Sequence, residues 1–386
     1  MNKSILISGV TIADAIEESY IGDILLEDGK ISRVAEKIDA QADVHIDATD
    51  KNWTAFPGFI DVHIHGAAGH DAMDATPAAL NGVAGALPKE GTTSFLATTM
   101  TQSDEAISAA LKNIRDFQTQ DGQAEMLGVH LEGPFISDKR AGAQPIEHIV
   151  EPSYPLFRKW QKLSGGQIRL VTLAPETTNG LTFIKSLTED GVIASIGHSD
   201  GTLEEVQAAV RSGASHVTHL YNQMSPFHHR NPGVVGAALT ETGLTVEVIA
   251  DFIHSHPTSV ELAFRQKGAE RLILITDAMR AKGLAPGVYD LGGQDVQVTR
   301  KDARLADGTL AGSILTMDTA IRNIQSITGC SLNELVAMTS ANAAKELGLA
   351  SKGKLQGGTD ADIAILDDSF TVQLTICRGT IAYTKE

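Results

Sequence analysis

Short apolar runs alternate with longer amphipathic stretches through the middle of this chain. A buried parallel strand needs a continuous apolar run, whereas a helix packed on a sheet needs apolar residues at intervals of three to four positions. The apolar runs predict strands at about residues 57–63, 92–98, 126–131, 168–174, 192–197, 215–219, 245–250 and 272–277. The amphipathic stretches predict helices, among them PAALNGVAGALPKE, DEAISAALKNIRDFQTQ, TLEEVQAAVRSG and PTSVELAFRQKG. Eight such units over roughly 290 residues are typical of a (β/α)8 barrel.

The two ends of the chain have a different pattern, in which β-branched runs are separated by Asp-Gly and Gly turns. The N-terminal runs are SILISGVTIAD, GDILLEDGKISRVAE and ADVHIDATD, and the C-terminal segment is GTDADIAILDDSFTVQLTICRGTIAYT. Neither end has enough strands to close a core alone. We therefore expect an α/β fold, with a (β/α)8 TIM-like barrel over residues 56–350 and a small β-sandwich domain formed by residues 1–55 together with 351–386.

Residues 284–312 interrupt the alternation after the eighth predicted strand. Their short strands and Gly turns predict an inserted β-hairpin. A doubly wound open sheet is the alternative architecture for the middle of the chain. It is disfavoured because no Gly-rich phosphate-binding fingerprint follows an early strand.

Composition limits which binding partners and which cellular location are expected. The formal net charge of −17 disfavours nucleic acid and anionic membranes as general partners, and a small anionic substrate would need a local cluster of positive groups. Cys330 and Cys377 lie in apolar surroundings without CxxC spacing, so we expect buried thiols. No run approaches the roughly 20 apolar residues of a membrane span, and the N-terminus lacks a signal-peptide pattern. We therefore expect a cytoplasmic protein.

Residues that favour metal ions stand at or just beyond the ends of the predicted strands. They are His63 and His65 in FPGFIDVHIHG, Glu132 in GVHLEGPF, His198 in SIGHSD, His219 in VTHLYN and Asp277 in LILITDAM. Residues i and i+2 of a strand share a face, so His63 and His65 can bind one ion. A glutamate at a buried strand end needs a cation or strong hydrogen bonds. A carboxylate beside a metal can ligate it or act as general base toward bound water, so this pattern predicts metal-assisted hydrolysis with Asp277 as the catalytic residue.

The spacing between these residues supports a shared site. Barrel units average about 30 residues. Glu132 lies 67 residues after His65, and His198 lies 66 residues after Glu132, so each interval spans about two units. Each residue alone also has an ordinary explanation, as a hydrogen-bonded core histidine or as half of a salt bridge. His130, on the same strand face as Glu132, is expected to orient the ligands rather than bind the metal.

The order HxH, Glu, His, His, Asp on a predicted barrel resembles the amidohydrolase superfamily. Within it, HLEGPF, GHSD, THLYNQM, HHRNPG, ITDAM and LAGSILTMD look like the motifs of the N-acetylglucosamine-6-phosphate deacetylases. The resemblance covers nearly the whole chain. It implies an enzyme that hydrolyses N-acetyl-D-glucosamine 6-phosphate to D-glucosamine 6-phosphate and acetate, in amino-sugar catabolism or cell-wall sugar recycling. In that family Glu132, His198 and His219 would hold the principal metal, a metal-bound hydroxide would attack the acetamide, and Asp277 would carry the proton to the sugar amine.

The same motifs imply the residues that bind the substrate. These are Gln144, Asn222, Gln223, Arg230, His254, Leu310, Ala311 and Gly312. Arg230 resembles the family's phosphate-binding arginine, and a guanidinium suits a phosphate through paired hydrogen bonds. In the family the arginine or the histidine can reach across a dimer interface, which implies a homodimer. Gln144 stands where some members have a histidine near the substrate carbonyl, so its role is open.

The number of metal ions and the exact substrate are open at this point. Some members replace the first two histidines and use one ion, whereas His63 and His65 make a second ion feasible; zinc, iron, manganese and cobalt all suit such ligands. The galactosamine-6-phosphate deacetylase differs by one substrate hydroxyl and is an alternative. Other hydrolases of the superfamily, such as a dihydroorotase or a D-aminoacylase, leave Arg230 and HLEGPF unexplained. A non-catalytic sugar-phosphate-binding protein would be expected to lack Asp277 or a ligand.

Overall fold

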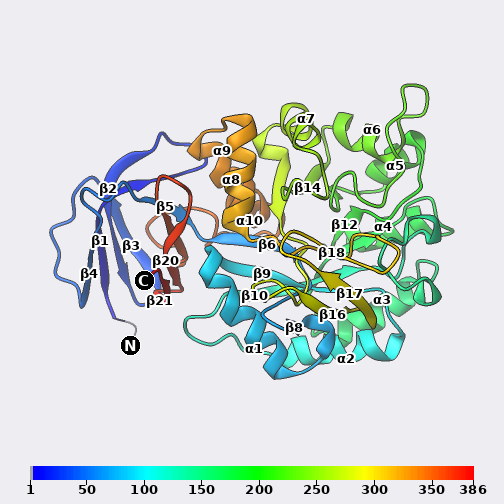
Figure 1. Ribbon diagram of the computed structural model, residues 1–386, viewed down its shortest axis with the longest axis horizontal. Coiled ribbons are helices and arrows are strands. Elements are labelled where there is room, and N and C mark those ends of the chain that lie inside the picture. The colour runs from blue at the N-terminus through cyan, green and yellow to red at the C-terminus, as the bar shows by residue number, and fades with distance from the viewer. Residues whose placement is uncertain (1–2) are drawn as a thin grey trace.

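The central part of the molecule is a barrel of eight parallel strands (Figure 1). The computed structural model describes residues 3–386, and in it the barrel strands follow one another in chain order. They are β6 (Phe59–Ile64), β9 (Thr92–Thr99), β10 (Glu125–Glu132), β11 (Ile168–Leu173), β12 (Ile193–Ile196), β13 (His216–Val217), β14 (Thr245–Ile249) and β15 (Leu272–Ile275). Each of them overlaps one predicted strand.

Contacts just beyond β15 close the barrel against β6. The N–H of Asp277 donates to the carbonyl of His63 at 2.8 Å. The hydroxyl of Thr276 donates to the carboxylate of Asp61 at 2.5 Å. Because Thr276 and Asp277 follow β15 directly, the first and last strands meet at their carboxyl ends. The side chains that these two strands deliver to the barrel mouth are therefore neighbours.

Amphipathic helices cover the outside of the barrel, and α2 (Asp104–Asp116) shows how the sequence specifies them. The Ser103 side chain caps its first turn, Asp104 and Glu105 lie at the positive end of the helix dipole, and Ile107 and Leu111 are buried. The other longer helices are α1 (Pro77–Ala86), α3 (Tyr154–Leu163), α4 (Gly180–Glu189), α5 (Leu203–Arg211), α6 (Gly233–Thr240), α7 (Pro257–Lys267) and α8 (Met317–Thr328). The short α9 (Leu332–Val336) and α10 (Asn342–Glu346) follow them. Within residues 3–386 no helix has both the length and the apolar composition of a membrane span.

The two chain ends form a second, mixed sheet beside the barrel, on the left of Figure 1. Its strands are β1 (Ile5–Ile12), β2 (Tyr20–Glu27), β3 (Lys30–Ala35), β4 (Val44–Asp47), β5 (Thr54–Pro57), β19 (Ile363–Leu366), β20 (Val372–Cys377) and β21 (Thr380–Thr384). Ile7 and Ile24 share a core with Ile363 and Ile376, so the strands of both ends pack together. The predicted barrel with a β-rich domain built from both ends is confirmed. The limits near residues 55 and 350 stay predictions, and residues 1 and 2 lie outside the described part.

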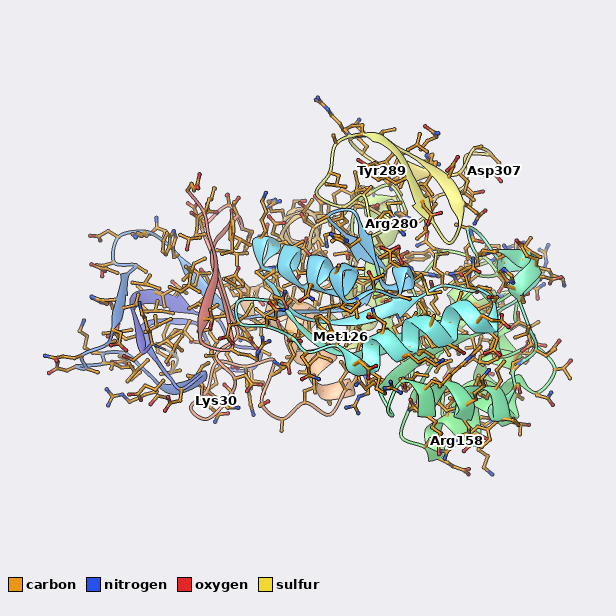
Figure 2. The ribbon with its side chains drawn as sticks, turned by 90° about the horizontal axis from the view of Figure 1, so that it is seen from below. Lys30, Met126, Arg158, Arg280, Tyr289 and Asp307 are labelled. Carbon is orange, nitrogen blue, oxygen red and sulfur yellow. The ribbon has the colours of Figure 1, made fainter. Side chains whose placement is uncertain are left out.

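A three-stranded antiparallel sheet follows the last barrel strand, inside the segment 284–312 where we predict a hairpin. Its strands are β16 (Gly287–Leu291), β17 (Gln294–Val298) and β18 (Ala303–Arg304). Leu291 and Val296 are buried in one small cluster with Met100 and Met279, which attaches the sheet to the barrel. Figure 2 shows it projecting from the body of the molecule, with Tyr289 and Asp307 labelled near its tip.

Candidate active site

The predicted ligand residues lie at the carboxyl ends of the barrel strands. Glu132 is the last residue of β10, whereas His198, His219 and Asp277 each stand two residues beyond a strand. Those three have positive φ angles of 47°, 28° and 48°. A left-handed backbone at a non-glycine residue costs energy that the surrounding structure must offset, and such positions concentrate at functional sites. These turns bring side chains from separate strands to one place.

Glu132, His198 and His219 form the first of two compact groups. The Oε1 atom of Glu132 lies 3.3 Å from Nε2 of His198 and 3.1 Å from Nε2 of His219. The two Nε2 atoms are themselves 3.1 Å apart. The other ring nitrogen of His198 donates to the carbonyl of Arg140 at 2.8 Å, which leaves its lone pair on Nε2. Three ligand atoms therefore face one point.

His63, His65 and Asp277 form the second group. The Oδ1 atom of Asp277 lies 3.4 Å from Nε2 of His63 and 3.3 Å from Nε2 of His65. Glu132 stands between the groups, since its Oε2 atom is 3.3 Å from Nε2 of His65. Nε2 of His63 is buried and makes no hydrogen bond in the described part of the chain. A buried polar atom without a partner is costly, and a cation would satisfy it.

The donor set of both groups fits a divalent cation. Imidazole nitrogens and carboxylate oxygens are the ligands of zinc, iron, manganese and cobalt sites. Each group offers three ligand atoms that all lie within 4.8 Å of one another. Three protein ligands beside an open cavity are typical of a catalytic rather than a structural metal site. The residues present can hold one ion, or two ions with Glu132 between them.

Burial and mutual charge shift the pKa values of the centre in opposite directions. Burial alone would raise the pKa of Glu132, but His63 and the other imidazoles hold it well below its usual range. Burial alone would lower the pKa of His65, whereas Asp277 and Glu132 raise it to about 10. Protons on His63 and His65 therefore offset the carboxylate charges when no cation is bound. Binding of a cation would displace those protons.

A cavity of about 320 Å³ lies against this centre. Its wall contains His65, Glu132, His198, His219 and Asp277, together with the predicted substrate residues Gln144, Asn222, Gln223, His254, Leu310 and Gly312. The amide of Gln144 donates to Oε2 of Glu132 at 2.8 Å, and its carbonyl accepts from the N–H of Thr101 at 2.7 Å. His254 donates from Nδ1 to Asp251 at 2.6 Å. Most of the predicted site residues thus share one enclosure.

Comparison with known proteins shows what the whole chain is similar to. The model of the amidohydrolase family matches residues 54–382. An N-acetylglucosamine-6-phosphate deacetylase of Lysinibacillus sphaericus is 51% identical over 98% of this chain and 97% of its own length. An N-acetylgalactosamine-6-phosphate deacetylase of Escherichia coli O157:H7 is 39% identical over 84% of this chain and 87% of its own length. The solved structure of a mutant N-acetyl-D-glucosamine-6-phosphate deacetylase of Mycobacterium smegmatis in complex with N-acetyl-D-glucosamine-6-phosphate has a TM-score of 0.91 and 30% identity, over 99% of this chain and 100% of that chain.

The chain belongs to the amidohydrolase family. The resemblance to the N-acetylglucosamine-6-phosphate deacetylases within that family is also confirmed.

Two predicted substrate residues of this amidohydrolase lie outside the cavity wall. Ala311 is buried in the cluster that anchors the inserted sheet. Arg230 lies on an exposed loop, where its guanidinium donates to the ring of His229 at 2.7 Å. In a single chain Arg230 does not contribute to the cavity. Its role with phosphate stays a prediction that depends on the predicted homodimer.

His130 is not placed as a ligand of the amidohydrolase centre. Its Nδ1 donates to the carbonyl of Val62 at 3.2 Å, and its Nε2 accepts from the hydroxyl of Thr172 at 2.7 Å. Burial, and after it the charge of His63, lowers the pKa of His130 to about 3, so the ring is neutral. It packs edge-on against His63, with ring centroids 4.4 Å apart. The orienting role expected from the sequence stays a prediction.

Sequence reasoning missed two charged residues of the amidohydrolase site. Arg304 lines the cavity from β18. The sequence predicts short strands in that insertion, but it does not determine which of their faces turns toward the barrel mouth, so it has no signal that would place Arg304. Glu247 lies fully buried in β14 and bonds to both His63 and the backbone of His219. A single acid inside the apolar run TVEVI was the signal that could have found it, since a buried charge needs a specific partner.

Proposed function

We propose that this amidohydrolase hydrolyses the acetamide of N-acetyl-D-glucosamine 6-phosphate, giving D-glucosamine 6-phosphate and acetate. One observation carries the proposal: the Asp277 carboxylate faces His63 and His65 on the floor of a cavity whose wall also contains His254. A proton acceptor, a cation site and a potential phosphate contact thus share one enclosure. A relative that is 51% identical bears the name of this activity, and a solved neighbour is described with this substrate bound.

Asp277 has the place and the chemistry of the general base and acid. A divalent cation held by Glu132, His198 and His219, alone or with a second ion at His63 and His65, would supply an acidified water and polarise the acetamide carbonyl. Asp277 accepts the proton as the water oxygen bonds to the carbonyl carbon, and it returns the proton to the sugar nitrogen as the C–N bond breaks. Its pKa is lowered, since His63 and His65 outweigh the effect of burial, so it is ionised and ready to accept a proton.

The cavity wall suggests how the rest of the substrate is held. Gln144 keeps one amide hydrogen beyond its bond to Glu132 and can donate it to the acetyl oxygen. His254 and the backbone around Asn222 and Gln223 would receive the phosphate, and Leu310 with Gly312 would flank the sugar. Burial would lower the pKa of His254, but Asp251 raises it, which favours the charged form that binds phosphate.

The assembly and location belong to the same proposal. A homodimer would bring Arg230 of one subunit to the phosphate held by the other, which would explain why this arginine stands on an exposed loop in a single chain. Cytoplasmic location is supported by two free, buried cysteines. The division at residues 55 and 350 and the hairpin insertion at 284–312 are kept as proposed domain limits.

Acetate release from three substrates tests the function. We expect metal-loaded protein to act on N-acetylglucosamine 6-phosphate with a higher kcat/KM than on the galacto epimer, and to act poorly on unphosphorylated N-acetylglucosamine. Preference for the epimer would instead support the activity named for the Escherichia coli relative. Equal rates with and without phosphate would contradict the roles of His254 and Arg230. No acetate from any of the three would contradict the proposed function.

A further inference from the structure

A buried hydrogen-bonded chain runs from His63 away from the substrate cavity. Nδ1 of His63 donates to Oε2 of Glu247 at 2.9 Å. Oε1 of Glu247 accepts from Nε2 of His216 at 3.0 Å, and Nδ1 of His216 donates to Glu346 at 2.7 Å. His63, Glu247 and His216 are fully buried, whereas the side chain of Glu346, at the end of α10, is 18% exposed. These hydrogen bonds therefore connect the candidate metal site to the protein surface.

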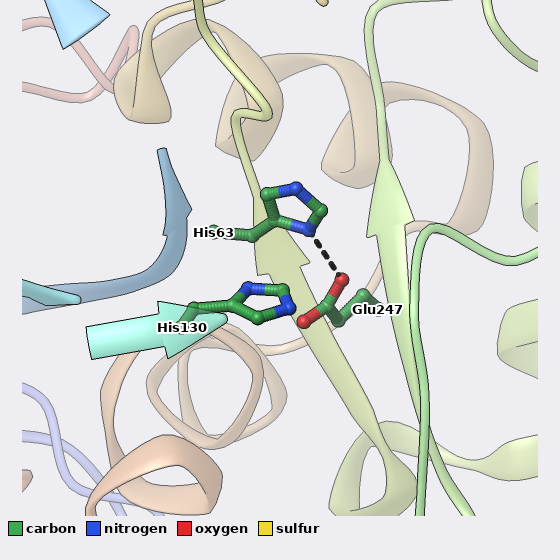
Figure 3. Close-up of side chains that lie close together, drawn as sticks. All are labelled: His63, His130 and Glu247. Carbon is green, nitrogen blue, oxygen red and sulfur yellow. Dashed lines mark hydrogen bonds and ion pairs between the residues drawn. The ribbon is translucent and has the colours of Figure 1, made fainter. Parts of the chain in front are cut away.

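The groups near Glu247 do not form a metal site of their own. His63, His130 and Glu247 lie close together (Figure 3), with one ligand atom from each within 4.8 Å of the others. Both ring nitrogens of His130 already have partners, the carbonyl of Val62 and the hydroxyl of Thr172. The dashed line in Figure 3 marks the bond from His63 to Glu247, so that nitrogen also has a partner. Hydrogen bonding accounts for this group without a cation.

The geometry determines which nitrogen of His63 is free. A carboxylate can only accept, so Nδ1 of His63 must carry the hydrogen in its bond to Glu247. Its other nitrogen, Nε2, is the buried atom without a hydrogen bond, 3.4 Å from Oε1 of Glu132 and 3.4 Å from Oδ1 of Asp277. A histidine that binds a metal is commonly held in this way by a carboxylate on its far nitrogen.

His216 and Glu346 keep Glu247 ionised and fix the orientation of its carboxylate. His216 lies between two carboxylates and donates to both, so its ring carries both hydrogens and a positive charge. Burial would lower the pKa of His216, but Glu346 and Glu247 raise it to about 10. That positive charge is the counter-ion that offsets the cost of burying Glu247. Oε2 of Glu247 also accepts from the N–H of His219 at 3.0 Å, which fixes its orientation further.

We propose that Glu247 is a positioning residue that fixes the His63 ring with Nε2 directed at a second divalent cation, and that His216 and Glu346 hold Glu247 in place. The inference rests on the proposed metal-dependent function and deepens it, because it explains how hydrogen bonds orient His63, which together with His65 and Asp277 would bind the second ion. Glu132, His198 and His219 keep their own ion under this proposal.

A Zn²⁺ titration tests the inference. Zn²⁺ is added to protein from which the metal has been removed, the bound ions are counted, and a competing chelator gives each dissociation constant. We expect the parent chain to bind two ions per subunit. Glu247→Leu should bind the weaker ion at least about 10-fold less tightly, within the range for lost partners of metal ligands, and the tighter ion nearly as before. Glu247→Gln should be intermediate, because its amide oxygen can still accept from His63. It also supplies the test if the leucine variant does not fold.

Two further variants complete the experiment. Glu346 contacts none of the predicted metal ligands, so Glu346→Gln should weaken binding of the second ion by a smaller factor than Glu247→Leu. An unchanged dissociation constant for that ion would overturn the roles of His216 and Glu346. Glu176→Gln, whose carboxylate accepts from the Ser199 hydroxyl and the Asp200 N–H, is the matched control and should bind both ions as the parent does. Equal weakening of both ions in Glu247→Leu, no weakening at all, or a single ion in the parent would overturn the proposal. Acetate release by the same parent preparation decides the proposed function separately.

Discussion

Glu132 is the residue on which both halves of the centre depend. Its Oε1 atom lies within 3.4 Å of Nε2 of His63, His198 and His219, and its Oε2 atom lies 3.3 Å from Nε2 of His65. A buried carboxylate of this kind would be costly without cations or donors around it. Gln144 supplies one donor by bonding to Oε2, so this residue, whose role was open from the sequence, holds the Glu132 carboxylate.

The pH dependence of phosphate binding should follow His254. Asp251 raises the pKa of this histidine against the opposing effect of burial, so the charged form persists above the usual range and is lost as pH rises through the raised value. KM for phosphorylated substrate should therefore increase across that range. His254→Asn should raise KM about 10- to 100-fold at lower pH, equivalent to about 1.5–3 kcal/mol for a hydrogen bond to a charged group, and should flatten the profile. KM for unphosphorylated substrate is the control, and a parallel change there would contradict the assignment.

At the scale of elements, the sequence specifies strands better than it specifies loops. The eight apolar runs predict the barrel, and the residues at their ends meet because parallel strands share one carboxyl edge. The two-residue spacing of His63 and His65 predicts a common face, and both rings approach Asp277. Arg230 and Arg304 lie in a loop and in an insertion, where no period fixes the direction of a side chain. The lone acid in the apolar run TVEVI indicates that Glu247 needs a partner, but its hydrogen bonds are tertiary, so no local pattern identifies His63 and His216 as those partners.

The inserted sheet should tune substrate binding without controlling metal binding. Val296 is fully buried in its small apolar core, and the insertion contributes Leu291, Arg304 and Leu310 to the cavity wall. Val296→Thr would bury a hydroxyl at a cost of about 1–3 kcal/mol. We expect faster proteolysis within residues 284–312 and a higher KM, with metal content unchanged. Gln297→Thr, at an exposed position of the same strand, is the control; an equal effect there, or loss of metal in Val296→Thr, would contradict this prediction.

At the scale of the whole molecule, one buried lysine joins the barrel to the terminal sheet. Nζ of Lys352 lies 2.6 Å from the carboxylate of Glu125, at the start of β10, and 2.5 Å from that of Asp362, just before β19. Asp360 is 3.4 Å away. Burial would lower the pKa of Lys352, but Asp362 and Glu125 raise it, so it remains charged. The three carboxylates could be mistaken for a metal site, but the ammonium group of Lys352 already lies within 3.4 Å of all three.

Removal of that lysine should destabilise the fold. Lys352→Met leaves neighbouring carboxylates without a counter-ion, and breaking a buried ion pair costs about 3–5 kcal/mol. We expect about 3 kcal/mol, the low end, because Glu125 is partly exposed. Denaturant unfolding at neutral pH measures the loss. Lys354→Met replaces an exposed lysine two residues away and should change the free energy of unfolding little, so similar losses in both variants would refute the proposed link.

The most direct test of the whole account is the rate of acetate release from N-acetylglucosamine 6-phosphate by Asp277→Asn, measured on protein whose metal content is known. Asparagine keeps the size of the side chain but cannot accept and return the proton. The account predicts a fall in kcat of at least about 100-fold, the lower value for general acid–base catalysis, while the ion at Glu132, His198 and His219 is retained. Turnover close to that of the parent, with the same metal content, would contradict it.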